Sequence, residues 1–111
     1  MYEHSKQGAV DVITGDEPLN LDAVDRVSRL LEDCIGRGQP RIVLDFGGVA
    51  LIDSAGLELL LDARQRCGQR GGRLQLAALS PLCHDILDVT GLASEFETFD
   101  DVLSAVGSFA R

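Results

Sequence analysis

A serine that follows an aspartate is the part of this sequence best placed to do chemistry. Ser54 comes directly after Asp53, behind two apolar stretches, residues 42–46 and 49–52, that are largely β-branched as buried strands are. From Leu57 onward the apolar spacing is typical of a helix. A hydroxyl at the start of a helix can cap it, attack a substrate if a base stands beside it, or accept a phosphoryl group.

Nucleophilic catalysis by Ser54 lacks the companion groups that it needs. A GxSxG motif is missing, because Ile52 and Gly56 stand two residues to either side of the serine. The only histidines are His4, in an N-terminal segment that we expect to be loose, and His84, which we expect on a helix surface. The sequence therefore predicts a protein that is not an enzyme.

Other patterns that suggest binding chemistry fail on their context. The Asp-Phe-Gly triplet at 45–47 matches the magnesium-binding triplet of protein kinases, but the other kinase motifs are missing. Residues 68–73 are rich in glycine but lack the lysine and hydroxyl of a phosphate-binding loop. The cysteines, Cys34, Cys67 and Cys83, are odd in number and form no CxxC pair. We therefore expect buried free thiols, and we predict neither a metal nor a cofactor.

The composition is that of a soluble globular domain. The chain has 111 residues, of which 45% are hydrophobic and 25% charged, enough for one domain with its own core. A net charge of −8 argues against nucleic acid as a partner, because phosphate contacts need clustered Lys and Arg. No apolar run approaches the roughly 18–20 residues that span a bilayer, and the N-terminus does not resemble a signal peptide. We expect a cytoplasmic protein without membrane insertion.

Strand-like and helix-like segments alternate along the chain, which is typical of an α/β fold. The first helix is predicted to start with Asp22 as its N-cap, and the second to run from about Ser54 to Cys67. The other predicted segments are an outer strand at 8–13, strands at 41–46, 73–79 and 95–99, a helix from Ser80-Pro81 to Gly91 and a final helix at 100–110.

These segments suit an open, mixed sheet of four or five strands, with about four helices mainly on one face. We expect one domain over residues 1–111, with its core at roughly 8–109.

One interpretation of this serine is purely structural: Asp53 or Ser54 caps the following helix and stabilises it by ~1 kcal/mol. Two features favour a docking and modification site instead. The following helix has a polar face that includes Glu58, and Leu59 falls beside that face near Ala55, so that we expect this leucine to be half-exposed. A phosphate on Ser54 would add about −1.5 to −2 charges beside Asp53, which can repel a partner without unfolding the domain.

Several short motifs follow one another in the order and at the spacings that are typical of one protein family. "LDF" closes a strand, "IDSAGL" surrounds the serine, and "GGRLQL", Ser80-Pro81 and "VTGL" follow at similar spacings. Over residues 21–106 the sequence is similar to the STAS-domain family, in particular to the bacterial anti-sigma factor antagonists. The resemblance implies a single STAS domain over residues 1–111.

The resemblance also implies a function. In that family the serine after the aspartate is phosphorylated by an anti-sigma factor that is itself a serine kinase of the histidine-kinase-like ATPase type. Ser54 is the residue at that position, with Asp53, Gly56 and Leu57 as matching neighbours. The unphosphorylated antagonist binds the anti-sigma factor and frees the sigma factor. Phosphorylation releases the antagonist, and a phosphoserine phosphatase resets it.

Two positions depart from the family pattern. The family tends to carry G-x-L-D before the first helix, and here residues 19–22 keep Asp22, which the resemblance places near the serine, but not the glycine. Glu58 replaces a residue that is often small. The alternative function is a STAS scaffold in a transport or stress-signalling complex, without phosphoregulation. The predicted partner-binding residues are Asp22, Asp53, Ser54, Ala55, Gly56, Glu58 and Leu59.

Overall fold

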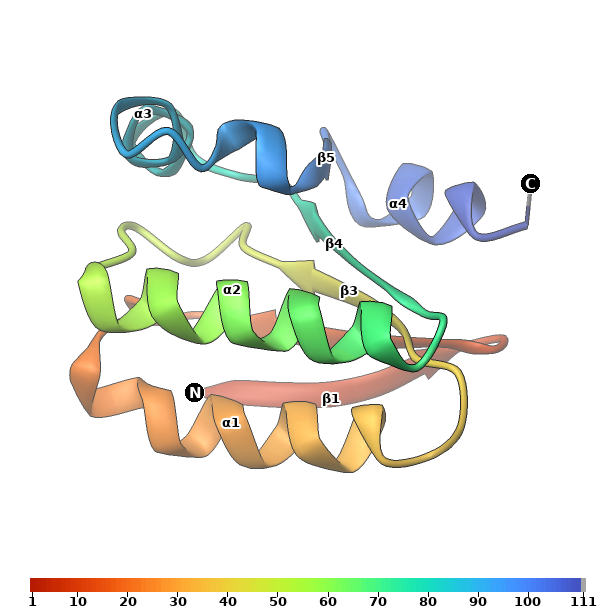
Figure 1. Ribbon diagram of the computed structural model, residues 1–111. Helices are drawn as coiled ribbons and strands as arrows, with labels where there is room; N and C mark the ends of the chain where they lie inside the picture. The colour runs from red at the N-terminus through yellow and green to blue at the C-terminus, as the bar shows by residue number, and fades with distance from the viewer. Residues whose placement is uncertain (111) are drawn as a thin grey trace.

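A five-stranded sheet carries the other elements of the fold (Figure 1). The structure is a computed structural model, and it describes residues 1–110. Within these residues the strands follow one another across the sheet in chain order; β1 and β2 are antiparallel, and each later pair is parallel. The predicted α/β class and mixed open sheet are therefore confirmed. The strands are β1 (Tyr2–Gln7), β2 (Val10–Gly15), β3 (Arg41–Asp45), β4 (Arg73–Ala77) and β5 (Glu97–Phe99).

Helices cover the two faces of this sheet unequally. The helices of the described chain are α1 (Leu21–Ile35), α2 (Ser54–Gln69), α3 (Pro81–Val89), the short 3-10 helix η1 (Ala93–Glu95) and α4 (Val102–Ser108). α1 and α2 lie side by side over one face, whereas α4 packs on the other (Figure 1). The prediction of helices mainly on one face is confirmed, with α4 as the exception. Among residues 1–110, no helix combines the length and apolarity that crossing a bilayer needs.

The central strand β3 is buried on both sides, which explains its continuous apolar sequence. Ile42 and Leu44 belong to the larger core cluster, with α1, α2 and α3, whereas Val43 belongs to the smaller cluster, with Ala105 of α4. Successive side chains of a strand point to opposite faces, so both faces of β3 must be apolar. All three cysteines are buried and free, as the sequence predicts.

The N-terminal segment differs from the prediction. Residues 2–7 form the edge strand β1, which pairs with β2 over six residues, from Tyr2↔Gly15 to Gln7↔Val10. The strand predicted at 8–13 is therefore the second of the sheet and not the outer one. β1 is polar and mostly exposed, so that its sequence lacks the apolar alternation that identifies a half-buried strand.

The start of α1 also differs. Its N-cap is Asn20, in extended backbone conformation, and the Asn20 side chain accepts a hydrogen bond from the Ala23 N–H at 3.2 Å. The predicted cap, Asp22, instead lies in the first turn, where a carboxylate interacts favourably with the helix dipole. α2 begins at Ser54, as predicted, and extends two residues beyond the predicted end.

Candidate functional site

The N-termini of α1 and α2 are held side by side by a short parallel bridge between Leu19 and Ile52. The Leu19 N–H donates to the carbonyl of Leu51 at 3.0 Å, and the Asp53 N–H donates to the carbonyl of Leu19 at 3.1 Å. Each helix begins two residues after its bridging residue. Two helix N-termini, with their unpaired N–H groups and positive dipole ends, therefore meet around Asp53.

The Asp53 carboxylate serves both helices. Its Oδ1 accepts from the Gly56 N–H at 2.9 Å, which caps α2. Its Oδ2 accepts from the Leu21 N–H at 3.1 Å, at the start of α1. Because Asp53 does the capping, the hydroxyl of Ser54 is not needed for it. In the described part of the chain, the Ser54 side chain is exposed and its hydroxyl makes no hydrogen bond.

Gly56 allows the two helix starts to approach this closely. A Cβ at this position would lie 2.3 Å from the Leu19 carbonyl oxygen and 2.9 Å from the Ile52 Cγ2 atom. Both contacts are too short for real atoms, and one of them is to backbone that cannot move easily. Gly56 is buried, and its role in the structure is packing; its predicted part in partner binding stays a prediction.

The predicted partner surface is only partly on the surface. Asp22, Ser54 and Glu58 are exposed, and Asp53 and Ala55 are half-buried. Leu59 is only 8% exposed and belongs to the main core, so the prediction that it is half-exposed is wrong. The buried residues of α2 are Gly56, Leu59, Leu60, Ala63 and Cys67, so its buried face is wider than the sequence indicates. Leu59 belongs to the core cluster that α2 shares with α1, α3 and the sheet.

Three exposed leucines that the sequence did not indicate lie at the start of α1, in the segment before Asp53 and at the start of α3. Leu21 is 73% exposed at the start of α1, and Leu51 is 38% exposed two residues before Asp53. Leu82 is 51% exposed in the first turn of α3. That turn lies against the loop before Asp53, because the neighbouring thiol of Cys83 donates to the Val49 carbonyl at 3.5 Å. We call Leu21, Leu51 and Leu82 the leucine rim; exposed apolar side chains near one point are typical of a protein contact.

The charge around Ser54 is negative. Asp53 lies beside the serine and Asp22 follows Leu21, whose N–H Asp53 binds. Among residues 1–110, no Lys or Arg forms an ion pair with either carboxylate. The first basic residue of α1, Arg26, instead pairs with Glu17. The two helix N-termini offer partial positive charge to an anion at this place.

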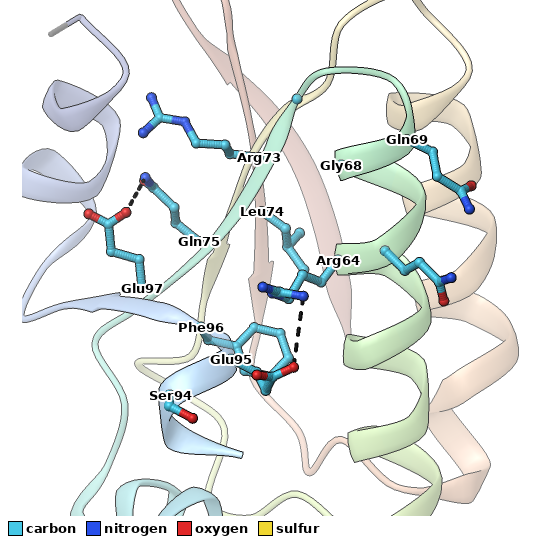
Figure 2. A pocket seen from close by; sticks show the side chains of 12 residues that line it. Arg64, Gly68, Gln69, Arg73, Leu74, Gln75, Ser94, Glu95, Phe96 and Glu97 are labelled. Atoms are coloured by element: carbon cyan, nitrogen blue, oxygen red, sulfur yellow. Dashed lines mark hydrogen bonds and ion pairs between the residues drawn. The ribbon is translucent and has the colours of Figure 1, made fainter.

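A separate hollow of about 820 Å³ lies along the C-terminal half of α2, between this helix, β4 and the segment before β5 (Figure 2). Two of its charged groups pair with each other, since Arg64 lies 3.9 Å from Glu95, and the Gln75 amide donates to Glu97 at 3.4 Å. The Arg73 guanidinium lies over the Phe109 ring, 4.8 Å from its centroid. Within residues 1–110, no buried side-chain N or O atom lacks a partner. Arg64 stands ten residues after Ser54, or about 15 Å along the helix, so the hollow does not belong to the serine site.

Comparison with known proteins agrees with this architecture. The sequence matches the STAS domain family over residues 3–105. It is 27% identical to the anti-sigma F factor antagonist of Paenibacillus polymyxa, covering 94% of this chain and 88% of that one. It is 31% identical to a protein of Bordetella bronchiseptica named as an anti-sigma factor antagonist, BtrV, covering 68% of this chain and 65%, just under two thirds, of that one.

Solved structures show the same fold. An anti-sigma factor antagonist structure from Thermotoga maritima superposes with a TM-score of 0.92 at 19% identity, over 99% of this chain and 95% of that one. The Bacillus cell fate determinant SpoIIAA in its phosphorylated form superposes with a TM-score of 0.76 at 20% identity, over 98% and 99%. Because the family match covers residues 3–105, nearly all of the chain, this protein belongs to the STAS domain family.

Proposed function

We propose that the protein is an anti-sigma factor antagonist that is switched off by phosphorylation of Ser54. The observation that carries the proposal is the division of work between Asp53 and Ser54. The carboxylate holds both helix starts, which leaves an exposed hydroxyl without a structural task at the same point. Relatives named as antagonists, and a phosphorylated structure with the same fold, support the assignment.

The partner of the unmodified protein is an anti-sigma factor that is a serine kinase of the histidine-kinase-like ATPase type. The exposed groups around Ser54, with the leucine rim, form the surface that we assign to this partner. Binding sequesters the anti-sigma factor in the cytoplasm and frees the sigma factor. The antagonist itself catalyses no reaction, and a phosphoserine phosphatase restores the binding form.

A phosphate on Ser54 should leave the fold intact. The first turn of α2 tolerates an anion, since a negative charge at a helix N-terminus is favourable by about 0.3–1 kcal/mol. This phosphate would lie beside Asp53, a carboxylate with which no Lys or Arg of the described residues forms an ion pair. In the free protein the phosphate therefore stays hydrated. A partner that covers it must bury an unpaired anion, which costs several kcal/mol, and the affinity falls.

The test is phosphorylation by an ATPase-type anti-sigma factor encoded in the same genome, followed by intact-mass measurement and peptide mapping. We expect one phosphate, on Ser54, which Ser54→Ala abolishes and the exposed control Ser94→Ala does not. Calorimetry should show that wild type and Ser54→Ala bind the kinase, and that the phosphoprotein and, in part, Ser54→Asp do not. A phosphoprotein that binds as tightly as the unmodified form would instead favour a constitutive STAS scaffold.

A further inference from the structure

A second cluster of reactive side chains lies at the other end of α1, on the side of the sheet that this helix covers. It consists of His4 on β1, Asp11 on β2 and Cys34 in the last turn of α1. The His4 Nε2 atom lies 2.6 Å from Asp11 Oδ1, and one ligand atom from each of the three residues lies within 4.8 Å of the others. The cluster plays no part in the site around Ser54.

The pairing of the N-terminal strands assembles the cluster. In the β1–β2 register Lys6 is opposite Asp11, and residues opposite each other point to the same face. His4, two residues before Lys6, shares that face. Cys34 reaches the same place from α1 and is 2% exposed. Asp11 is also buried, in a strand whose other buried side chains are apolar.

We propose that His4, Asp11 and Cys34 form a Zn²⁺ site. Imidazole, thiolate and carboxylate are the three ligand types that zinc takes in proteins, with bond lengths of about 2.0–2.3 Å. In a tetrahedral site with such bonds the ligand atoms stand about 3.3–3.8 Å apart. The ligand atoms lie within 4.8 Å of one another, so no pair has to close by more than about 1–1.5 Å, and the His4–Asp11 pair, at 2.6 Å, has to open by about 0.7 Å. The histidine of the edge strand, whose side chain is 28% exposed, can supply this adjustment.

The fourth zinc position has room for water. A hollow of about 450 Å³ opens beside the cluster and is lined by His4, Cys34 and Arg37, together with Asp33. A site with three protein ligands and one open position is the arrangement of catalytic and exchangeable zinc rather than of closed structural zinc.

Two basic side chains now stand where a cation would bind. The Arg37 Nη2 atom lies 3.6 Å from Asp11 Oδ1 and 3.8 Å from the Cys34 sulfur, and the Lys6 Nζ atom lies 3.6 Å from the same Asp11 oxygen. Both side chains are more than half exposed, at 54% and 52%, so that they can turn out to solvent. The positions of the Lys6 and Arg37 side chains indicate that the cluster attracts positive charge. Both side chains would compete with a metal ion for the Asp11 carboxylate. Removing Arg37 should therefore strengthen metal binding.

Titration of the chelator-treated, tag-free protein with Co²⁺, followed by competition with Zn²⁺, tests the proposal. We expect one Co²⁺ per chain and the charge-transfer absorption of a thiolate ligand. The absorption should disappear in Cys34→Ser, and the affinity should fall at least about tenfold in His4→Gln. The matched controls Cys67→Ser and His84→Gln should bind as wild type does. Arg37→Ala should bind about three- to tenfold more tightly, because one competing charge is gone.

The outcomes separate clearly. Co²⁺ binding without thiolate absorption overturns the proposal, and so does Co²⁺ binding that both Cys34→Ser and His4→Gln retain. The absence of binding at 0.1 mM Co²⁺ also overturns it, because the binding free energy would then be weaker than about 5.5 kcal/mol. If Cys34→Ser fails to fold, metal binding by His4→Gln decides the test, because glutamine is a polar side chain in a strand that is already polar and mostly exposed. Thermal melts with and without Zn²⁺ give a second readout, because a ligand that binds the folded protein raises its melting temperature.

Discussion

Replacing Asp53 with alanine should destabilise the fold about twice as much as removing an ordinary helix cap. The reason is that its two carboxylate oxygens accept from the Gly56 N–H at 2.9 Å and from the Leu21 N–H at 3.1 Å. Both N–H groups belong to helix first turns and have no intrahelical partner. The substitution leaves one unpaired donor on each of two helices.

The magnitude follows from these two bonds. Loss of an N-cap costs ~1 kcal/mol, within a range of about 0.5–2, and the second hydrogen bond, to a charged group at an exposed position, contributes about 1–2 kcal/mol more. We therefore expect Asp53→Ala to lose about 2–3 kcal/mol of unfolding free energy. For a domain of this size, each kcal/mol lowers the melting temperature by about 4–6 °C, so the shift should be roughly 8–18 °C.

Urea denaturation and thermal melts would measure the loss against two controls. Asn20→Ala removes a cap with a single bond, to the Ala23 N–H at 3.2 Å, and should cost ~1 kcal/mol. Ser54→Ala removes a hydroxyl that makes no hydrogen bond within the described chain and should cost about 0–0.5 kcal/mol. If Asp53→Ala and Asn20→Ala are equally unstable, the carboxylate does not bridge the two helices. If Ser54→Ala is the more damaging change, the serine and not the aspartate is the cap.

Two further predictions concern the interior. Gly56→Ala should destabilise the protein by about 1–3 kcal/mol in urea melts, because the new Cβ would lie 2.3 Å from the Leu19 carbonyl oxygen. In the same helix a Cβ at Gly68 would meet nothing within 4 Å, so Gly68→Ala should stabilise the protein by about 0.5–1 kcal/mol. If both substitutions stabilise the protein, or both destabilise it, the close packing of Gly56 against Leu19 is contradicted. Burial raises the pKa of the Cys67 thiol to about 11, so the folded protein should resist iodoacetamide at pH 8 and its stability should fall as the pH rises from 9 to 11. Mass spectrometry of native and denatured samples would check the labelling, and rapid modification of native Cys67 would refute the burial argument.

The serine site could be predicted because its chemistry is local. An acid, a hydroxyl and a glycine between a strand and a helix are sufficient to place Ser54 in the first turn of α2, where the structure has it. The N-cap of α1 could not be decided from the sequence alone, because Asn20 and Asp22 are both favourable N-cap residues. The bridge between Leu19 and Ile52 decides between them, because it holds the chain extended up to Asn20. A contact over 33 residues leaves no mark in the local sequence.

The burial of Leu59 and the presence of strand β1 could not be predicted from the sequence, because each depends on contacts with other parts of the chain. Leu59 is buried in a core that several elements share, and β1 is an edge strand whose exposed polar side chains give no period-2 signal. The proposed zinc ligands depend on both the β1–β2 pairing and the end of α1. Their spacing in sequence, 7 residues from His4 to Asp11 and 23 from Asp11 to Cys34, matches no metal motif.

The two proposed sites lie at opposite ends of α1, and this distance makes their tests independent. Leu21, whose N–H Asp53 binds, and Cys34 are thirteen residues apart in one helix, which is about 20 Å. Hydrogen bonds hold each end locally, and perturbations farther apart than about 10 Å without shared partners are usually additive. A signal along α1 would need an element with two discrete arrangements, and an uninterrupted helix packed on the sheet is not one. A metal bound at the Cys34 end should therefore stabilise the domain without altering how Ser54 meets its kinase, and the failure of either proposal would leave the other standing.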